Sequence, residues 1–224
     1  MIPNKIHYCW FGGQPFPALI KRCMASWHAN LENFEIIEWN ESNTPIDEHP
    51  YMKLAYEKGK WAFVADYMRM LALYEHGGIY LDTDMEVIRP LSDLLNNKLF
   101  MGFETSTQVS AGIIGAVAGD AFFLDCMNAM NQNIAGKKPQ FITIPLIMGN
   151  ILNTSNHSNY IYPKEFFYPY NPYCQESTTS QLMFSDITEN TYAIHHWNAS
   201  WTKPKTYIDY LIHILRYAKK TFPI

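Results

Sequence analysis

Several patterns that would point to a particular class of protein are scarce in this 224-residue chain. The four cysteines have no CxxC spacing, which argues against a zinc cluster or a redox motif. The formal net charge is -4, so no basic field exists to attract nucleic acid, and none is expected as a partner. No apolar run reaches the roughly 18 residues of a membrane-spanning helix. No signal-peptide pattern opens the sequence, so a cytoplasmic location with reduced thiols is expected.

Strand-like and helix-like segments alternate along the chain and predict an α/β fold in one domain. Residues 136–190 are polar and rich in Pro, Tyr and Asn, so loops and short elements are expected there. The expected strands are 2–11, 34–39, 79–84, 99–103, 111–117 and 192–197, and the expected helices are 18–30, 53–76 with a break near Gly59, 121–134 and 207–220.

The acidic triplet Asp82-Thr83-Asp84 ends an apolar strand that follows a Gly-Gly pair. Alternate residues of a strand share a face, so Tyr80, Asp82 and Asp84 are expected to point the same way. Two carboxylates about 7 Å apart repel each other unless a cation or a proton lies between them. Oxygen ligands suit Mg²⁺ or Mn²⁺, and these ions commonly bind substrate phosphates. A divalent metal held by Asp82 and Asp84 is therefore predicted.

The helix before this strand carries one acid and one base, Asp66 and Arg69, among apolar neighbours. At positions i and i+3 the two side chains share a helix face. An exposed pair would be a weak ion pair, but the apolar neighbours favour a buried pair that faces a ligand. Asp66 can accept hydrogen bonds from sugar hydroxyls, and the Arg69 guanidinium can donate to oxygen-rich ligands.

A later segment, HHWNASW at residues 195–201, is a second cluster of polar and aromatic residues. Adjacent residues of a strand face opposite sides, so only one of His195 and His196 can join a given site. A neutral imidazole is a good additional ligand for Mn²⁺.

Trp10 and Gly78 are two further candidates, because open α/β sheets bind ligands where their strands end. Trp10 precedes a glycine pair at the end of the first expected strand, where it could stack on a base or pack into the core. Gly78 belongs to the Gly-Gly pair, and glycine permits a close approach between backbone and ligand.

The segments IHYCWFGG, AFVADYMRMLALYEHGGIYLDTD and AIHHWNASW together resemble the DxD-containing sugar transferases of glycosyltransferase family 32. The glucosylating domains of the large clostridial toxins share the same order and similar spacing. The resemblance implies a GT-A fold, which is a single Rossmann-like domain with a mixed, mostly parallel sheet flanked by helices. Residues 1–103 would form the nucleotide-sugar donor half, and residues 104–224 the acceptor half and a closing segment.

The resemblance also implies roles for individual residues. Asp84 resembles the direct ligand of Mn²⁺ or Mg²⁺, and Asp82 the acid that touches ribose or sugar and meets the metal directly or through water. His195 resembles a late ligand of the metal or diphosphate, and His196 is the less favoured choice. The implied donor-binding residues are Asp66 and Arg69 at the sugar, Tyr80 in the pocket, Trp10 at the base, and Ser200 and Trp201 over the diphosphate.

By this resemblance the chain is expected to be a metal-dependent, retaining glycosyltransferase. It would move a hexose or N-acetylhexosamine from a nucleotide sugar, with UDP preferred, to a glycan or lipid-linked glycan acceptor. Bacterial capsule, exopolysaccharide or lipopolysaccharide synthesis is the expected setting. The expected helix 207–220 ends in basic residues, so peripheral contact with the inner membrane face stands beside ordinary packing as its role.

Two other functional classes are open from the residues alone. A phosphatase of the haloacid dehalogenase type also places a DxD motif after an apolar strand, but it requires Thr or Val where this chain has Glu86. A glycan-binding module without chemistry would use the 15% aromatic content. Such a module has no need of paired acids.

Overall fold

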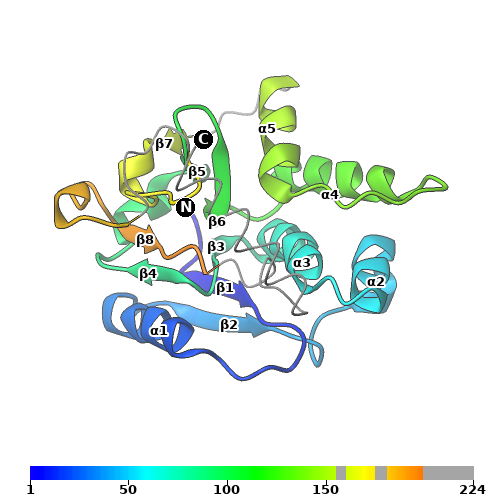
Figure 1. Cartoon of the computed structure of the whole chain (residues 1–224), viewed down its shortest axis with the longest axis horizontal. Helices are drawn as coiled ribbons and strands as arrows, with labels where there is room; N and C mark the ends of the chain where they lie inside the picture. The colour runs from blue at the N-terminus through cyan, green and yellow to red at the C-terminus, as the bar shows by residue number, and fades with distance from the viewer. Residues whose placement is uncertain (155–159, 175–180, 199–224) are drawn as a thin grey trace, which may run out of the picture.

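The fold is built on a mixed six-stranded sheet, seen in a computed structural model that describes residues 1–154, 160–174 and 181–198 (Figure 1). The strands of this sheet are β1 (Lys5–Cys9), β2 (Glu35–Trp39), β3 (Gly78–Leu81), β5 (Leu99–Phe103), β6 (Val109–Ala116) and β7 (Tyr160–Tyr162). Their order is β2-β1-β3-β6-β5-β7. The pairs β1–β2, β1–β3 and β5–β7 are parallel, whereas β6 runs antiparallel to β3 and β5.

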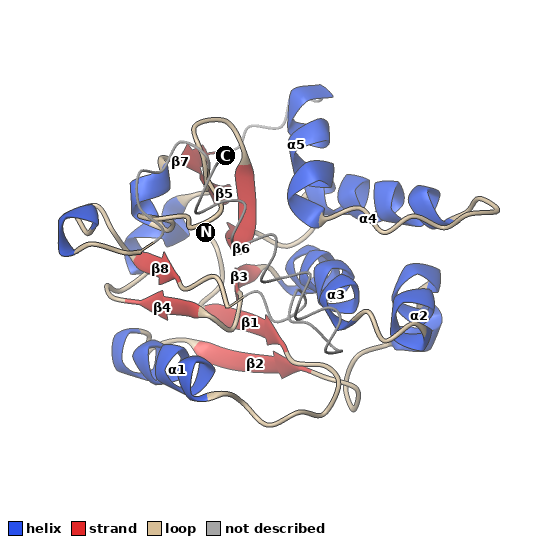
Figure 2. Cartoon of the chain, viewed as in Figure 1, coloured by secondary structure: helices blue, strands red, loops and turns tan. Residues whose placement is uncertain are grey.

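Helices cover the sheet on both faces (Figure 2). The helices are α1 (Ala18–Asn30), α2 (Pro50–Glu57), α3 (Trp61–His76), α4 (Ala121–Ile134) and α5 (Ile144–Thr154), with short 3₁₀ turns at Ile46–Glu48, Ser92–Asn96, Lys164–Phe166 and Phe184–Asp186. One core joins α2, α3, α4 and α5 to the sheet, and the second core joins α1 and the 3₁₀ turns Ser92–Asn96 and Lys164–Phe166 to the other face. The predicted α/β sheet flanked by helices is therefore confirmed.

A two-glycine turn connects α3 directly to β3. Gly77 has φ +61° and Gly78 φ +107°, which are conformations that side-chain-bearing residues rarely adopt. A Cβ atom on Gly78 would lie 2.7 Å from the carbonyl oxygen of Lys5, and one on Gly77 would lie 2.7 Å from the amide of Ala118. Both glycines are thus required by backbone packing, and they fix where β3 begins.

A second, two-stranded sheet brings the late part of the chain to the acidic motif. Strand β4 (Met85–Val87) pairs antiparallel with β8 (Ala193–His195), and Met85 lies opposite His195. Helix α1 braces β4 from the other side, because the indole of Trp27 donates to the Met85 carbonyl at 2.7 Å and Asn30 donates to the Val87 carbonyl at 2.9 Å.

Most expected elements are confirmed, and two differ. Helices 18–30 and 121–134 and strand 99–103 have the predicted bounds. The strand expected over 79–84 stops at Leu81, because the Met85 amide donates to the Asp82 carbonyl and closes a turn. Helix α5 lies where loops were expected; its apolar sequence buries Ile144, Ile147 and Met148, and a proline is tolerated in a first helical turn.

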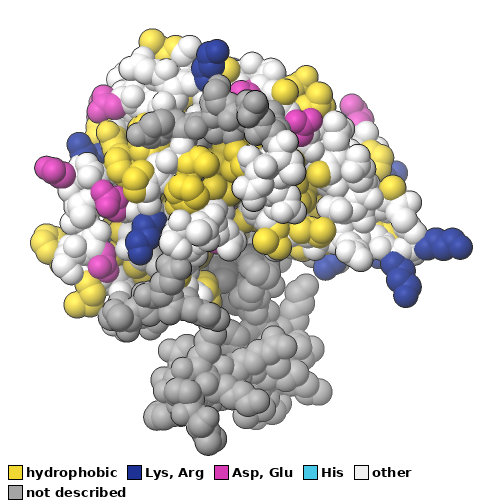
Figure 3. Space-filling model, turned by 90° about the horizontal axis from the view of Figure 1, so that it is seen from above, with side chains coloured by type: hydrophobic (Ala, Val, Ile, Leu, Met, Phe, Trp, Pro, Cys, Tyr) yellow, Lys and Arg dark blue, Asp and Glu magenta, His cyan; other side chains and the backbone are white. Residues whose placement is uncertain are grey.

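The expected helix 207–220 lies outside the described residues. Among the helices that the structure describes, none is long and apolar enough to cross a membrane. On the face seen from above, basic and acidic side chains are scattered around the rim and form no continuous basic patch (Figure 3), in keeping with the net charge of -4.

Candidate active site

The turn at residues 82–84 is held from two sides by backbone hydrogen bonds. The Asp82 amide donates to the carbonyl of Gly112 in β6 at 2.8 Å, and the His196 amide donates to the Asp84 carbonyl at 3.0 Å. The two acids therefore sit on a clamped turn, and the predicted shared face of an extended strand is wrong in this detail. The turn still brings both carboxylates to the same place.

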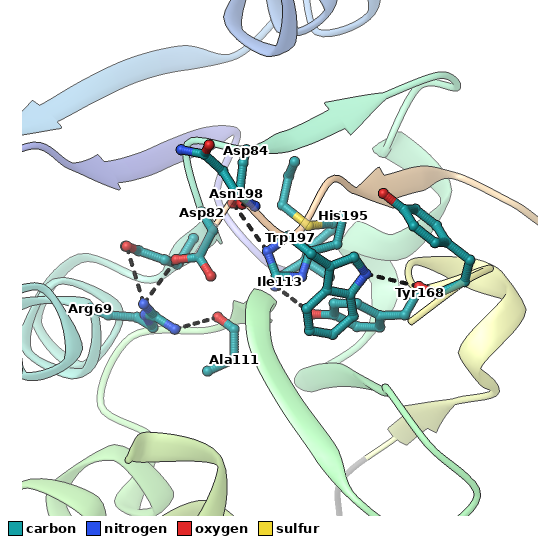
Figure 4. A network of polar contacts seen from close by, with 12 residues as sticks. Arg69, Asp82, Asp84, Ala111, Ile113, Tyr168, His195, Trp197 and Asn198 are labelled. Carbon is teal, nitrogen blue, oxygen red and sulfur yellow. Dashed lines mark hydrogen bonds and ion pairs between the residues drawn. The ribbon is translucent and has the colours of Figure 1, made fainter. Parts of the chain in front are cut away.

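Asp82, Asp84 and His195 form a compact group of three candidate metal ligands, whose ligand atoms all lie within 4.8 Å of one another (Figure 4). His195 Nε2 donates to Asp84 Oδ1 at 3.1 Å, and the Asn198 amide donates to Asp84 Oδ2 at 2.7 Å. His196 faces away and pairs with Glu86 at 2.7 Å. Of the two histidines, His195 is the one that the fold brings to the acids.

The donor set fits a divalent cation. His195 Nδ1 is buried and has no hydrogen-bond partner within the described ranges, which is costly unless a ligand or ion satisfies it. Burial disfavours charge on both His195 and Asp84, but their mutual attraction and hydrogen bond outweigh it. The pKa of His195 is therefore raised, and that of Asp84 lowered. An ionised carboxylate with a second carboxylate and an imidazole suits Mn²⁺ or Mg²⁺.

Both terminal nitrogens of Arg69 are bound by protein groups around the acids. Its Nη1 donates to the carbonyl of Ala111 at 2.7 Å, and its Nη2 lies 2.9 Å from Asp82 Oδ1 and 3.3 Å from Asp66 Oδ1. The guanidinium also stacks over the Tyr80 ring at 4.3 Å. Arg69 therefore links α3 to the acidic turn and fixes one oxygen of Asp82.

Asp66 and Asp82 are carboxyls whose burial disfavours their charged form. Burial raises the pKa of Asp66 to about 6, although Arg69 opposes the shift. Burial likewise raises the pKa of Asp82, with Arg69 again opposing and the charge of Asp84 adding to the rise. Such acids gain from a positive ion or from hydroxyl donors beside them. Displaced pKa values of this kind gather at functional sites.

A β-bulge in β6 supplies the backbone groups that hold the site together. The β5–β6 register shifts between Met101 and Gly102, which leaves residues 111–113 outside the regular ladder. The Ala111 carbonyl accepts from Arg69, and the Ile113 amide donates to the Tyr168 hydroxyl at 2.9 Å. The Gly112 carbonyl, on the β3 side, accepts from the Asp82 amide one step beyond the Leu81–Ile113 pair. Bulges commonly re-aim groups beside functional sites in this way.

The other predicted donor-binding residues lie in different surroundings. Tyr80 is only 2% exposed and lies beneath Arg69, so it supports the site from the core. Gly78 lies at the opposite end of β3 from the acids and packs against Lys5, so the structure does not bring it to this site. Trp10 follows the end of β1, with its ring on Phe16 and its indole donating to the Gln14 carbonyl at 2.6 Å. Ser200 and Trp201 lie outside the described residues.

Tyr168 and Glu104, near the site, were not identified from the sequence, and Trp197 was noted only as a member of the HHWNASW cluster. Trp197 and Tyr168 pack on the His195 ring, with ring centroids 4.3 Å and 5.7 Å away. Glu104, at the β5–β6 turn, interacts electrostatically with His195 and Asp82. The only sequence signal for Glu104 was an acid directly after a strand, which is common on any surface.

Comparison with known proteins agrees with this geometry. Residues 17–101 match the family model described as "Glycosyltransferase sugar-binding region containing DXD motif", and the triplet Asp82-Thr83-Asp84 lies inside the match. This part of the chain is therefore similar to the DXD-containing sugar-binding region of glycosyltransferases. The matched segment extends over α1, α2, α3 and β3 and reaches into β5.

Two curated relatives are similar to this chain in sequence. The chain is 23% identical over 212 residues to "Inositol phosphoceramide mannosyltransferase 3" of Schizosaccharomyces pombe, covering 87% of this chain and 57% of the relative. It is 31% identical over 133 residues to "Uncharacterized glycosyltransferase L373" of Acanthamoeba polyphaga mimivirus, covering 53% of this chain and 50% of the relative. The chain thus spans little more than half the length of these relatives.

A solved structure shares the arrangement around the sugar-binding region. The glycosyltransferase titled "PaToxG Glycosyltransferase" superposes with a TM-score of 0.56 at 15% identity, covering 68% of each chain. At this identity the likeness concerns the fold alone, and that fold is the GT-A arrangement of a mixed, mostly parallel sheet flanked by helices.

Proposed function

We propose that this chain is a metal-dependent glycosyltransferase that moves a hexose or N-acetylhexosamine from a nucleotide sugar, with UDP preferred, to a glycan or lipid-linked glycan acceptor. The observation that carries the proposal is the convergence within 4.8 Å of His195 with Asp82 and Asp84, the acids of the triplet that lies inside the family match. Two carboxylates and an imidazole can bind a divalent cation, and that cation can bind a diphosphate. The match of residues 17–101 to the glycosyltransferase family model favours sugar transfer over the phosphatase and the binding module.

In this proposal Asp84 and His195 hold Mn²⁺ or Mg²⁺, with Asp82 beside them. The ion supplies electrostatic stabilisation of the negative charge that develops on the departing diphosphate. Asp82 and Asp66, both held by Arg69, would face the donor sugar and stabilise the positive charge that develops on its ring. The rigid turn and the buried arginine pre-organise these charges before the donor arrives.

Retention at the anomeric carbon and a bacterial surface polysaccharide as the product are further parts of the proposal, carried by the family 32 resemblance. A cytoplasmic location is part of the same proposal; peripheral contact with the inner membrane face remains the alternative to ordinary packing for the expected helix 207–220. The fission yeast relative is named for mannosyl transfer to inositol phosphoceramide. GDP-mannose therefore joins UDP-glucose, UDP-galactose and UDP-N-acetylglucosamine among the donors to be tested.

The test is a donor screen that records release of nucleoside diphosphate and of sugar, with Mn²⁺, with Mg²⁺ and with a chelator. We expect one donor to be consumed only when a divalent ion is present. Asp84→Asn should lose this activity at least about 100-fold, because the remaining ligands cannot hold the ion. Asp47→Asn, which alters a surface ion pair with Lys53, is the matched control and should retain it. Activity that persists with chelator would contradict the proposal.

A further inference from the structure

The end of the β5–β6 hairpin presents one acid, Glu104, toward the active site. Gly102 pairs directly with Ser110, and Phe103 pairs with Val109. Phe103 and Val109 pack into the core that contains α3, so Gly102 and Ser110 face the opposite side of the sheet. Glu104, two residues beyond Gly102, continues on this side. Its amide donates to the Gln108 carbonyl at 2.8 Å, which anchors the turn.

Two glycines let this hairpin approach the acidic turn closely. A Cβ atom on Gly112 would lie 3.1 Å from the Tyr168 hydroxyl and 3.4 Å from Asp82 Oδ2. A Cβ atom on Gly102 would lie 2.6 Å from the Phe167 ring. The space that side chains would fill is occupied instead by Tyr168 and by the second oxygen of Asp82. The hairpin is therefore part of the wall of the site.

Glu104 itself is half-buried among polar partners. Ser110 is only 4% exposed, and its hydroxyl lowers the pKa of both the Glu104 carboxyl and the Tyr168 hydroxyl, which places it beside both groups. The His195 ring and the Asp82 carboxylate are its charged neighbours across the site. Burial raises the pKa of Glu104, while the Ser110 hydrogen bond and His195 oppose the rise. Glu104 is thus a half-buried acid beside the site that does not belong to the three candidate metal ligands.

The two oxygens of Asp82 divide the site into two flanks. Oδ1 is bound by Arg69 of α3, on the same flank as Asp66. Oδ2 faces Gly112 and the Tyr168 hydroxyl, on the flank of the hairpin. The α3 flank carries the groups assigned to the donor sugar in the proposed function. The hairpin flank carries an acid and hydroxyl groups that neither the donor nor the ion uses.

We propose that Glu104 binds a hydroxyl group of the acceptor sugar on the flank of Asp82 opposite Arg69. This inference rests on the proposed function, which it extends to the second substrate. A carboxylate accepts strong hydrogen bonds from sugar hydroxyls, and one such bond fixes the direction from which the acceptor oxygen reaches the anomeric carbon. Glu104 acts here as a positioning residue that needs no proton transfer of its own.

The experiment compares transfer with donor hydrolysis, in which water takes the place of the acceptor. The full chain is given Mn²⁺, the donor found in the screen, and methyl glycosides of the common hexoses as acceptor probes. Glu104→Gln and Glu104→Ala are measured beside Glu165→Gln, whose parent side chain pairs with Asn190 at the surface. We expect the Glu104 variants to lower the ratio of transfer to hydrolysis about 10-fold or more by raising the acceptor KM.

The outcomes separate this inference from the proposed function. An equal loss of hydrolysis and transfer in Glu104→Gln, or a weaker affinity for Mn²⁺, would overturn the acceptor role. An unchanged ratio would overturn it as well, and so would hydrolysis by the wild-type chain without transfer to any methyl hexoside. If the wild-type chain consumes no nucleotide sugar at all, the proposed function itself fails. Thermal unfolding of each variant, expected within a few degrees of the wild type, checks that the fold is intact.

Discussion

At the scale of single residues, two adjacent histidines occupy different surroundings. His195 is the last residue of β8 and lies against Asp84, whereas His196 turns to Glu86 at the protein surface. Strand alternation predicts that only one of them enters the site. It does not predict which one, because that depends on the pairing of β8 with β4.

The histidine pair gives the first prediction. His195→Gln should weaken Mn²⁺ binding about 10- to 100-fold, because one candidate ligand and its hydrogen bond to Asp84 are lost. His196→Gln is the matched control and should leave Mn²⁺ affinity within about twofold. Calorimetric titration of each variant with Mn²⁺ makes the comparison. Equal affinities in the two variants would remove His195 from the metal site.

The second prediction concerns pH. The pKa of His195 is raised above its usual 6.5, since Asp84 outweighs the effect of burial. Only a neutral imidazole can bind a metal, so Mn²⁺ affinity should rise with pH through this raised pKa, up to about tenfold per pH unit. Without metal, the His195–Asp84 pair stabilises the fold fully below pH 6.5, and that stability is lost as pH rises through the raised value.

Titration with Mn²⁺ at about pH 6, 7 and 8, together with thermal unfolding without metal, measures both trends. As pH rises, Mn²⁺ affinity should increase and the stability of the metal-free protein should decrease. In His195→Gln both quantities should depend less on pH. A wild-type Mn²⁺ affinity that stays constant over this range would contradict the assignment.

At the scale of elements, the junction between α3 and β3 sets the position of the acidic turn. Gly78 was expected at the ligand, but its role is to let β3 start beside Lys5 without a clash. The third prediction is that Gly78→Ala destabilises the protein by about 3 kcal/mol, through its positive φ and its contact with the Lys5 carbonyl.

The matched control for this substitution is Gly149→Ala. Gly149 lies inside α5 with open space around its Cβ position, so alanine should stabilise the helix by about 0.5 to 1 kcal/mol. Denaturant unfolding measures both. Donor affinity per folded molecule should be unchanged in Gly78→Ala, and a specific loss of donor binding with normal stability would restore its ligand role.

Arg69 connects α3, the bulge of β6 and the acidic turn, and it gives the fourth prediction. Arg69→Lys keeps the charge but removes the forked donors that reach the Ala111 carbonyl and Asp82 together. A loss of about 1 to 3 kcal/mol of stability and a fall in turnover are expected. Arg89→Lys is the control, since Arg89 is exposed and only stacks on Tyr192. Equal effects of the two would show that Arg69 is dispensable as a link.

Some of these elements could be predicted from local sequence patterns, and others could not. The apolar α3, the Gly-Gly turn and the acids were readable because each is a local pattern with a local cause. The turn at 82–84 could not be predicted, since it is held by backbone contacts with Gly112 and His196, which are distant in the sequence. The bulge in β6 and the approach of Glu104 depend on the register with β5, which no local pattern encodes. Tyr80 was predicted to line the donor pocket, but it lies in the core beneath Arg69.

At the scale of the whole molecule, the fold gathers groups that are far apart in sequence onto one edge of the sheet. Asp84 and His195 are 111 positions apart, and the β4–β8 pairing brings them to hydrogen-bonding distance. The α3 flank and the hairpin flank then meet at Asp82. The central claim is that this meeting point holds a divalent ion, and that the ion holds the nucleotide sugar.

The most direct test is calorimetric titration of the full chain with its nucleotide-sugar donor, with and without Mn²⁺, in the wild type and in Asp84→Asn. We expect Mn²⁺ to strengthen donor binding by about tenfold or more in the wild type, and folded Asp84→Asn to lose this gain. Donor binding that is equally tight with and without the ion, in both proteins, would contradict it.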